Sequence, residues 1–145
     1  MKTAIFLDVD GVLNDLGHTK WPGKPDTFQA HLRSGQFYIE VPQHVPHLVA
    51  HLVRNFDVFW LTTWREEANR YFPQRFGFGE LPVLTDGGTD RNVVWKTPVA
   101  ARKANDLLLN GYDRIFWIED FYGDLPNIAG VIPIDTGNEG VLTPD

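Results

Sequence analysis

Short apolar runs alternate with amphipathic segments along most of this chain. The runs are rich in Val, Ile, Leu, Phe and Trp, which is typical of buried strands. They occupy residues 3–9, 57–61, 81–85, 114–118 and 131–134. Between them, residues 45–56 and 96–110 carry apolar side chains at helical spacing. Because strands alternate with helices, the sequence predicts an α/β fold with a parallel five-stranded sheet and helices on both faces.

Residues 15–41 depart from this alternation. Pro22, Gly23 and Pro25 indicate a loop. Residues 27–32 and 36–41 then alternate well enough to predict two short strands of a hairpin. We expect this segment to form a small flap over the tip of the first strand, because it is too short for a large cap domain.

Length and composition exclude several classes of protein. The 145 residues fit a single domain, 1–145, and the absence of cysteine excludes disulfides, thiolate metal sites and a thiol nucleophile. A net charge of −6 creates no global basic field for nucleic acid. No signal peptide is evident, and no apolar run approaches the roughly 18 residues of a membrane span. We therefore expect a cytoplasmic protein with no membrane partner; the sequence does not indicate its oligomeric state.

Three predicted strands end in polar side chains. These are Asp8 and Asp10 after the first strand, Thr62 and Thr63 after the second, and Glu119 and Asp120 after the fourth. Ligands bind at the carboxyl ends of parallel strands where the strand order reverses, so we expect these groups to converge. Converging carboxylates repel each other, and Mg²⁺ relieves this because it takes hard oxygen ligands. The sequence therefore predicts a magnesium site, to which Lys96 at a helix start adds a positive charge.

The acids also match a known family. Residues 8–14, Asp-Val-Asp-Gly-Val-Leu-Asn, resemble the first motif of the haloacid dehalogenase (HAD) superfamily of phosphatases. Thr62, Lys96 and the pair Glu119-Asp120 are similar to its second, third and fourth motifs, in order across nearly the whole chain. Residues 60–64, 68–69, 117–120 and 140–143 further resemble the small HAD domain associated with bacterial RNA-repair proteins. The resemblance implies a HAD-like, Rossmann-like sheet with a minimal cap at 15–41.

The resemblance implies a phosphatase mechanism. Asp8 attacks phosphorus and forms an aspartyl-phosphate, while Asp10 protonates the leaving oxygen and then activates water. Thr62 binds the phosphoryl oxygens with adjacent amides, and Lys96 balances their charge. A dehalogenase has no leaving alcohol to protonate and typically lacks the second acid, so Asp10 favours phosphoryl transfer.

The resemblance also implies a set of metal ligands. Asp8, the backbone carbonyl of Asp10 and Asp120 would hold Mg²⁺. Glu119 departs from the commoner Asp-Asp pair, so either it lies outside the ligand set or its longer side chain supplies the ligand. Which of Glu119, Asp120 and Asp124 contacts the ion stays open.

The substrate implied is a phosphorylated one: a nucleotide, an oligonucleotide end or a small phosphomonoester. Candidate contacts lie in the flap and after the second strand, at His18, Lys20, Trp21, Lys24, His31, Thr63 and Arg65. Arg65 suits bidentate contact with phosphate. Trp21 and Trp64 either stack on a base or pack the flap and the core.

Two other functions fit parts of this pattern. A receiver-like signalling module accepts phosphate as a switch and also uses acids, a Thr and a Lys on a parallel sheet. Its acceptor, however, lies on a middle strand, whereas here the first strand carries both acids. A non-catalytic phosphate-binding module is the second alternative, although it would have little use for Asp10.

Overall fold

A parallel sheet forms the centre of the molecule. The computed structural model describes residues 2–16, 21–89, 92–121, 123–137 and 139–144. Within them, the sheet has four strands in the order β4-β1-β5-β6, all parallel. Their bounds are β1 (Thr3–Leu7), β4 (Asp57–Trp60), β5 (Arg114–Glu119) and β6 (Val131–Asp135). The expectation of an α/β fold with a parallel sheet is confirmed.

The strand predicted at residues 81–85 is not found, so among the described residues the sheet has four strands and not the five predicted. Residues 81–85 make a single parallel bridge to the sheet, between Trp60 and Val83. Pro82 has no N–H to donate, which weakens a ladder at this point. Beyond the bridge, the side chains of Thr85 and Asp86 bind Arg65. The run therefore leaves the sheet edge after one contact.

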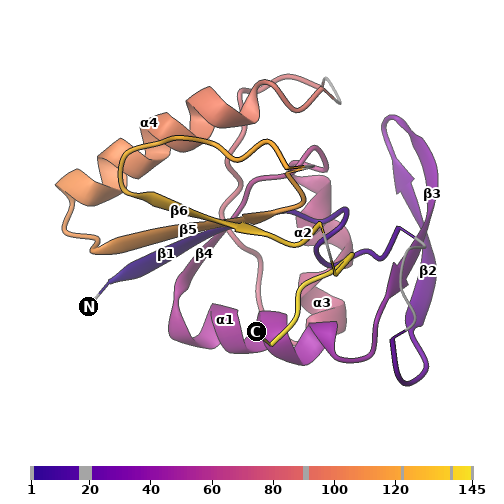
Figure 1. Ribbon diagram of the computed structural model, residues 1–145. Helices are drawn as coiled ribbons and strands as arrows, with labels where there is room; N and C mark the ends of the chain where they lie inside the picture. The colour runs from indigo at the N-terminus through magenta and orange to yellow at the C-terminus, as the bar shows by residue number, and fades with distance from the viewer. Residues whose placement is uncertain (1, 17–20, 90–91, 122, 138, 145) are drawn as a thin grey trace.

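Helices cover both faces of the sheet, as expected (Figure 1). On one face lies α4 (Lys96–Leu109); on the other lie α1 (Val45–Asn55), α2 (Glu67–Tyr71) and α3 (Pro73–Phe76). Successive side chains of β1 point to opposite faces of the sheet, so the strand contributes apolar groups to both layers of helices. Ala4 and Phe6 pack on the α4 side, and Ile5 and Leu7 pack on the other. No helix among the described residues is long and apolar enough to cross a membrane.

The predicted hairpin is present. The strands β2 (Asp26–Leu32) and β3 (Gly35–Val41) pair antiparallel and form a separate small sheet. It stands at the end of the molecule toward which the parallel strands run (Figure 1). Ala30, Ile39 and Val41 are buried in the core below it. The hairpin is thus anchored by apolar contacts on one side and lies near the carboxyl ends of the main sheet.

An aromatic cluster joins the second predicted motif to the helices beneath the sheet. Phe72 is fully buried at its centre. Its ring lies 5.2 Å from Trp64, 5.7 Å from Phe76 and 6.1 Å from Trp60, measured between centroids. Such aromatic contacts add to the stabilisation from buried area.

We predict that Phe72→Ala lowers the free energy of unfolding by about 3–5 kcal/mol, because it leaves a cavity that the rigid rings cannot fill. Urea denaturation followed by tryptophan fluorescence measures this. Leu109→Ala is the control, since Leu109 is 79% exposed and its truncation should change stability by no more than about 0.5 kcal/mol. Equal effects of the two variants would contradict the packing described.

Candidate active site

Asp8 and Asp10 lie at the carboxyl end of β1. The backbone N–H of Asp8 donates to the Ile118 carbonyl at 3.1 Å and so extends the ladder with β5. The chain then turns tightly, because the carbonyl of Val9 accepts the backbone N–H groups of residues 12–14. Asp8 is buried and Asp10 half-buried, and both line a cavity of about 610 Å³.

Gly11 brings the ends of β1 and β5 together. Its φ is +77°, and a Cβ there would lie 2.8 Å from the Cβ of Asp120. Any other residue would therefore be strained and would also clash. Thr136 links the same two ends: its hydroxyl donates to the Gly11 carbonyl at 2.6 Å, and its N–H donates to the Glu119 carbonyl at 3.1 Å. Asp120 is thereby held against the turn that carries both acids.

Lys96 connects the two strands electrostatically. It is the first residue of α4, and its side chain is buried. Its Nζ donates to Glu119 Oε1 at 2.8 Å and lies 3.3 Å from Asp8 Oδ2. Each of the three side chains is at most 10% exposed. A buried triad of this kind leaves a costly unpaired charge when one member is removed.

Burial shifts the proton affinities of the triad. Desolvation raises the pKa of Asp8, against the opposing effect of the Lys96 charge. Desolvation and the nearby Asp8 raise the pKa of Glu119 from 4.5 to about 7. For Lys96, desolvation by itself lowers the pKa, but the charges of Asp8 and Glu119 outweigh it and the pKa ends above its usual value. Lys96 therefore stays charged while Glu119 titrates near neutral pH.

The turn after β4 places two threonines at the cavity. Thr62 is fully buried. Its hydroxyl bonds to the Asp8 carboxylate, and this hydrogen bond acts to lower the pKa of Asp8. The same hydroxyl accepts the backbone N–H of Trp64 at 3.2 Å. Thr63 is half-buried and lines the 610 Å³ cavity with Asp8 and Asp10. The predicted groups Asp8, Asp10, Thr62, Thr63 and Lys96 are thus brought together.

Two residues hold the carboxylate of Asp10, a role that the sequence did not predict for either of them. The indole N–H of Trp64 donates to Asp10 Oδ2 at 3.2 Å, and the amide of Asn14 donates to Asp10 Oδ1 at 3.0 Å. Asn14 also accepts the backbone N–H of Glu40 in β3 at 2.9 Å, which ties the hairpin to Asp10. Trp64 is buried, so it packs the core and does not offer a face to a base. The polar Asn14 at the end of an apolar turn was the available signal.

Arg65 lines a neighbouring cavity of about 440 Å³ that shares Thr63 with the first, and its guanidinium is already engaged. Its φ is +52°, and its side chain is buried. Nε donates to Thr85 Oγ1 and Nη2 to Asp86 Oδ1, both at 3.0 Å, and the guanidinium stacks 4.3 Å from the Trp95 ring centroid. These contacts fix the loop after β4 against the residues that follow Val83. Arg65 therefore stabilises this loop. Its guanidinium is bonded to protein groups, so the structure does not present it as the phosphate contact that the sequence predicted.

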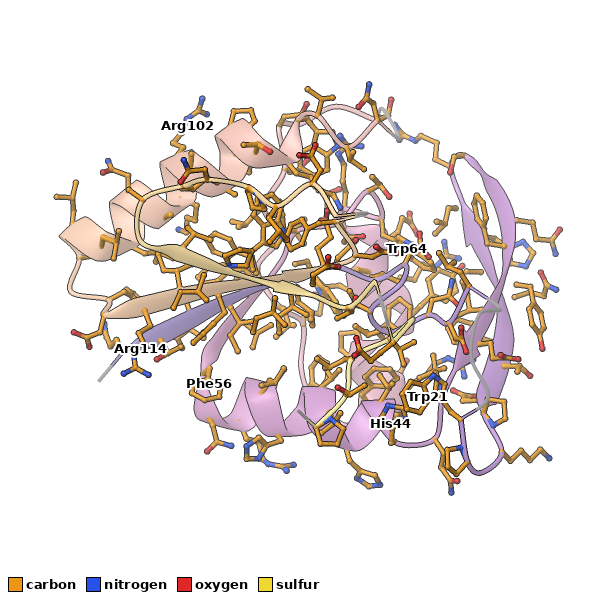
Figure 2. All side chains as sticks on the ribbon, viewed as in Figure 1. Trp21, His44, Phe56, Trp64, Arg102 and Arg114 are labelled. Carbon is orange, nitrogen blue, oxygen red and sulfur yellow. The ribbon has the colours of Figure 1, made fainter. Side chains whose placement is uncertain are left out.

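The flap candidates lie away from the acids. Trp21 packs on His44 (Figure 2). Their ring centroids are 4.6 Å apart, and Trp21 lines a separate 110 Å³ cavity. Lys24 is exposed and does not line the 610 Å³ cavity, and neither does the exposed His31. His18 and Lys20 lie outside the described residues. Among the described flap residues, Leu32 and Ser34 at the turn and Phe37 and Tyr38 in β3 share a 340 Å³ cavity with Asp10.

The carboxylates that line the cavity are of the ligand type that a hard cation takes. Glu119, Asp120 and Asp124 all line the cavity, but Glu119 is bonded to Lys96, and Asp124 is exposed. Asp120 is the acid that lies against the turn holding Asp8 and Asp10. Among the described residues, no three His, Asp or Glu side chains form a group that holds a metal alone. Mg²⁺ does not require one, because it binds one or two carboxylates and keeps several waters.

Comparisons of the chain with protein-family models, curated proteins and solved structures found no match.

We predict that Glu119 makes stability fall as the pH rises. Between pH 4.5 and about 7, the folded state keeps a proton that the unfolded chain has lost. The stabilisation is therefore complete below pH 4.5 and gone above about pH 7, a loss of at most about 3 kcal/mol. Urea denaturation from pH 5 to 8 in EDTA measures it.

Glu119→Gln should flatten this profile, while Asp8 keeps part of the slope because burial raises its pKa in the same direction. Glu80→Gln is the matched control, because Glu80 is exposed. If stability changed with pH in the same way in the wild type and in Glu119→Gln, the pKa of Glu119 would not be raised by folding.

Proposed function

We propose that this chain is a Mg²⁺-dependent phosphomonoesterase that works through an aspartyl-phosphate on Asp8. The observation that carries the proposal is the surroundings of Asp8. A buried carboxylate lies between a threonine hydroxyl and a lysine ammonium, and a second carboxylate faces the same cavity. Groups that bind phosphoryl oxygens and a group that moves a proton thus surround one nucleophile.

In the first step, an Asp8 oxygen attacks phosphorus and the bond from phosphorus to the ester oxygen breaks. The Thr62 hydroxyl, with nearby amides, and the Lys96 ammonium stabilise charge on the phosphoryl oxygens. Asp10 transfers its proton to the departing oxygen. Its carboxylate is held for this by Trp64 and Asn14.

In the second step, Asp10 takes a proton from water as the water oxygen attacks phosphorus. The bond from phosphorus to Asp8 breaks, and inorganic phosphate leaves with Asp8 regenerated. One residue thus serves as acid and then as base, which requires that its position not change between steps. Asp8, the Asp10 carbonyl and Asp120 would hold Mg²⁺, which reduces repulsion between the nucleophile and an anionic ester when bound. Glu119 positions Lys96 in this scheme.

The proposal places the chain with HAD-type phosphatases. The motif-like residues 8–14, Thr62, Lys96 and 119–120 support it. We infer that the sheet is a reduced Rossmann-like one, in which the bridge from Trp60 to Val83 marks the place of a fifth strand. The hairpin then serves as the minimal cap. Substrates in scope are nucleotides, oligonucleotide ends and small phosphomonoesters.

We predict turnover of p-nitrophenyl phosphate that requires Mg²⁺ and falls more than about 10³-fold in Asp8→Asn, because the variant loses its nucleophile. Release of nitrophenolate and of phosphate measures it. Asp106→Asn is the control, since Asp106 is exposed near the far end of α4 and should keep wild-type turnover.

Two outcomes would contradict the proposal. Labelling of Asp8 without turnover would favour a receiver-like switch. Neither labelling nor turnover, on a panel that includes 3′- and 5′-phosphorylated oligonucleotides, would favour a non-catalytic phosphate-binding module.

We predict a positioning role for Asn14. Asn14→Ala should slow single-turnover cleavage of an alkyl phosphate about 10- to 100-fold, because a misplaced Asp10 protonates the alkoxide poorly. The single-turnover rate of p-nitrophenyl phosphate cleavage should change little, since nitrophenolate leaves without a proton. Asn55→Ala, an exposed asparagine of α1, is the control. Equal slowing of both esters would indicate a merely structural role for Asn14.

A further inference from the structure

The cavity that holds Asp8 has an apolar rim. Val93, Val94 and Leu125 line it together with Asp8 and Lys96. Their exposed fractions are 55%, 72% and 52%, so these side chains face solvent in the free protein. Large exposed apolar groups around a concave site are typical of a ligand-binding groove. A volume of about 610 Å³ leaves room for a leaving group beyond the phosphoryl group.

The charged groups of the same cavity are almost all acidic. The acids are Asp8, Asp10, Glu119, Asp120 and Asp124. Lys96 is the one basic residue among the described residues that line it, and its ammonium is already shared by Asp8 and Glu119. Lys96, a bound divalent cation and the proton that Asp10 carries into the first step offset most of this charge, but Asp124 stays exposed in the cavity. A second phosphate in this cavity would lie near Asp124, and no basic side chain other than Lys96 lines the cavity among the described residues.

We propose that the substrate class of this site is a phosphomonoester with a single phosphate and an apolar leaving group. The inference rests on the proposed phosphatase function and narrows it. The phosphate lies at Asp8, while the leaving group packs on Val93, Val94 and Leu125. Polynucleotide ends and polyphosphates are disfavoured because their further phosphates would lie near Asp124 and the other acids.

One pair of esters isolates the apolar contact. Ethyl and hexyl phosphate have similar leaving-group chemistry and differ in four methylenes. We expect kcat/KM for hexyl phosphate to exceed that for ethyl phosphate about tenfold or more, through burial of part of the longer chain. Val94→Thr, a near-isosteric polar change, should lower this ratio at least threefold. Ile132→Thr is the control, since Ile132 is exposed on β6 and does not line the cavity.

A second pair isolates the charge. We compare 6-hydroxyhexyl phosphate with hexane-1,6-diyl bisphosphate, with kcat/KM expressed per phosphate. The bisphosphate should react about tenfold more slowly at low salt, and the difference should narrow at high salt because screening weakens repulsion. Asp124→Asn should narrow it at low salt too, whereas Asp106→Asn, at an exposed acid outside the cavity, should not.

The outcomes separate the inference from the function on which it rests. Absence of turnover for every ester, p-nitrophenyl phosphate included, would overturn the phosphatase proposal itself. Turnover with equal rates for ethyl and hexyl phosphate would overturn the inference alone. Faster cleavage of the bisphosphate, or of a 5′-phosphorylated oligonucleotide, than of hexyl phosphate would do the same.

Discussion

The buried ion triad of Asp8, Lys96 and Glu119 is the interaction on which the rest of the site depends. It joins the end of β1, the start of α4 and the end of β5, three segments far apart in the chain. Burial of two carboxylates against one ammonium is unfavourable for the acids, which is why the pKa values of Asp8 and Glu119 rise. The fold tolerates this cost because the sheet and the apolar clusters on its two faces hold the three segments in place. Carboxyl groups with perturbed pKa values are typical of functional sites.

The second acid is held by a different set of contacts. Trp64 reaches Asp10 from the turn after β4, and Asn14 reaches it while also bonding to β3. The aromatic cluster around Phe72 fixes Trp64, so the hydrophobic core beneath the sheet supports the position of Asp10. The hairpin is likewise tied to the acid through Asn14. Asp10 thus has a fixed place relative to Asp8, which the proposed use of Asp10 first as an acid and then as a base requires.

Much of this was predictable from the sequence, for a physical reason. The carboxyl ends of parallel strands meet at one edge, so acids and threonines that end successive apolar runs must lie near each other. The strand at 81–85 was predicted wrongly. Pro82 lacks an N–H for the ladder, and the apolar character of this run does not reveal that the contacts of Thr85 and Asp86 with Arg65 draw the chain away from the sheet. Contacts such as that of Trp64 with Asp10, 54 positions apart, depend on side-chain directions that strand patterns do not encode. At Gly11, in contrast, the positive φ and the closeness of Asp120 leave no room for a residue other than glycine.

In the proposed reaction, Asp8 carries the phosphoryl group covalently during turnover. Rapid acid quench of the protein with an excess of p-nitrophenyl phosphate and Mg²⁺, followed by peptide mass spectrometry, detects this intermediate. We expect the peptide containing Asp8 to gain the mass of one phosphoryl group, and hydroxylamine to convert this residue to a hydroxamate. Turnover that proceeds with Asp8 unmodified at every quench time, or a phosphoryl group found on another residue, would contradict it.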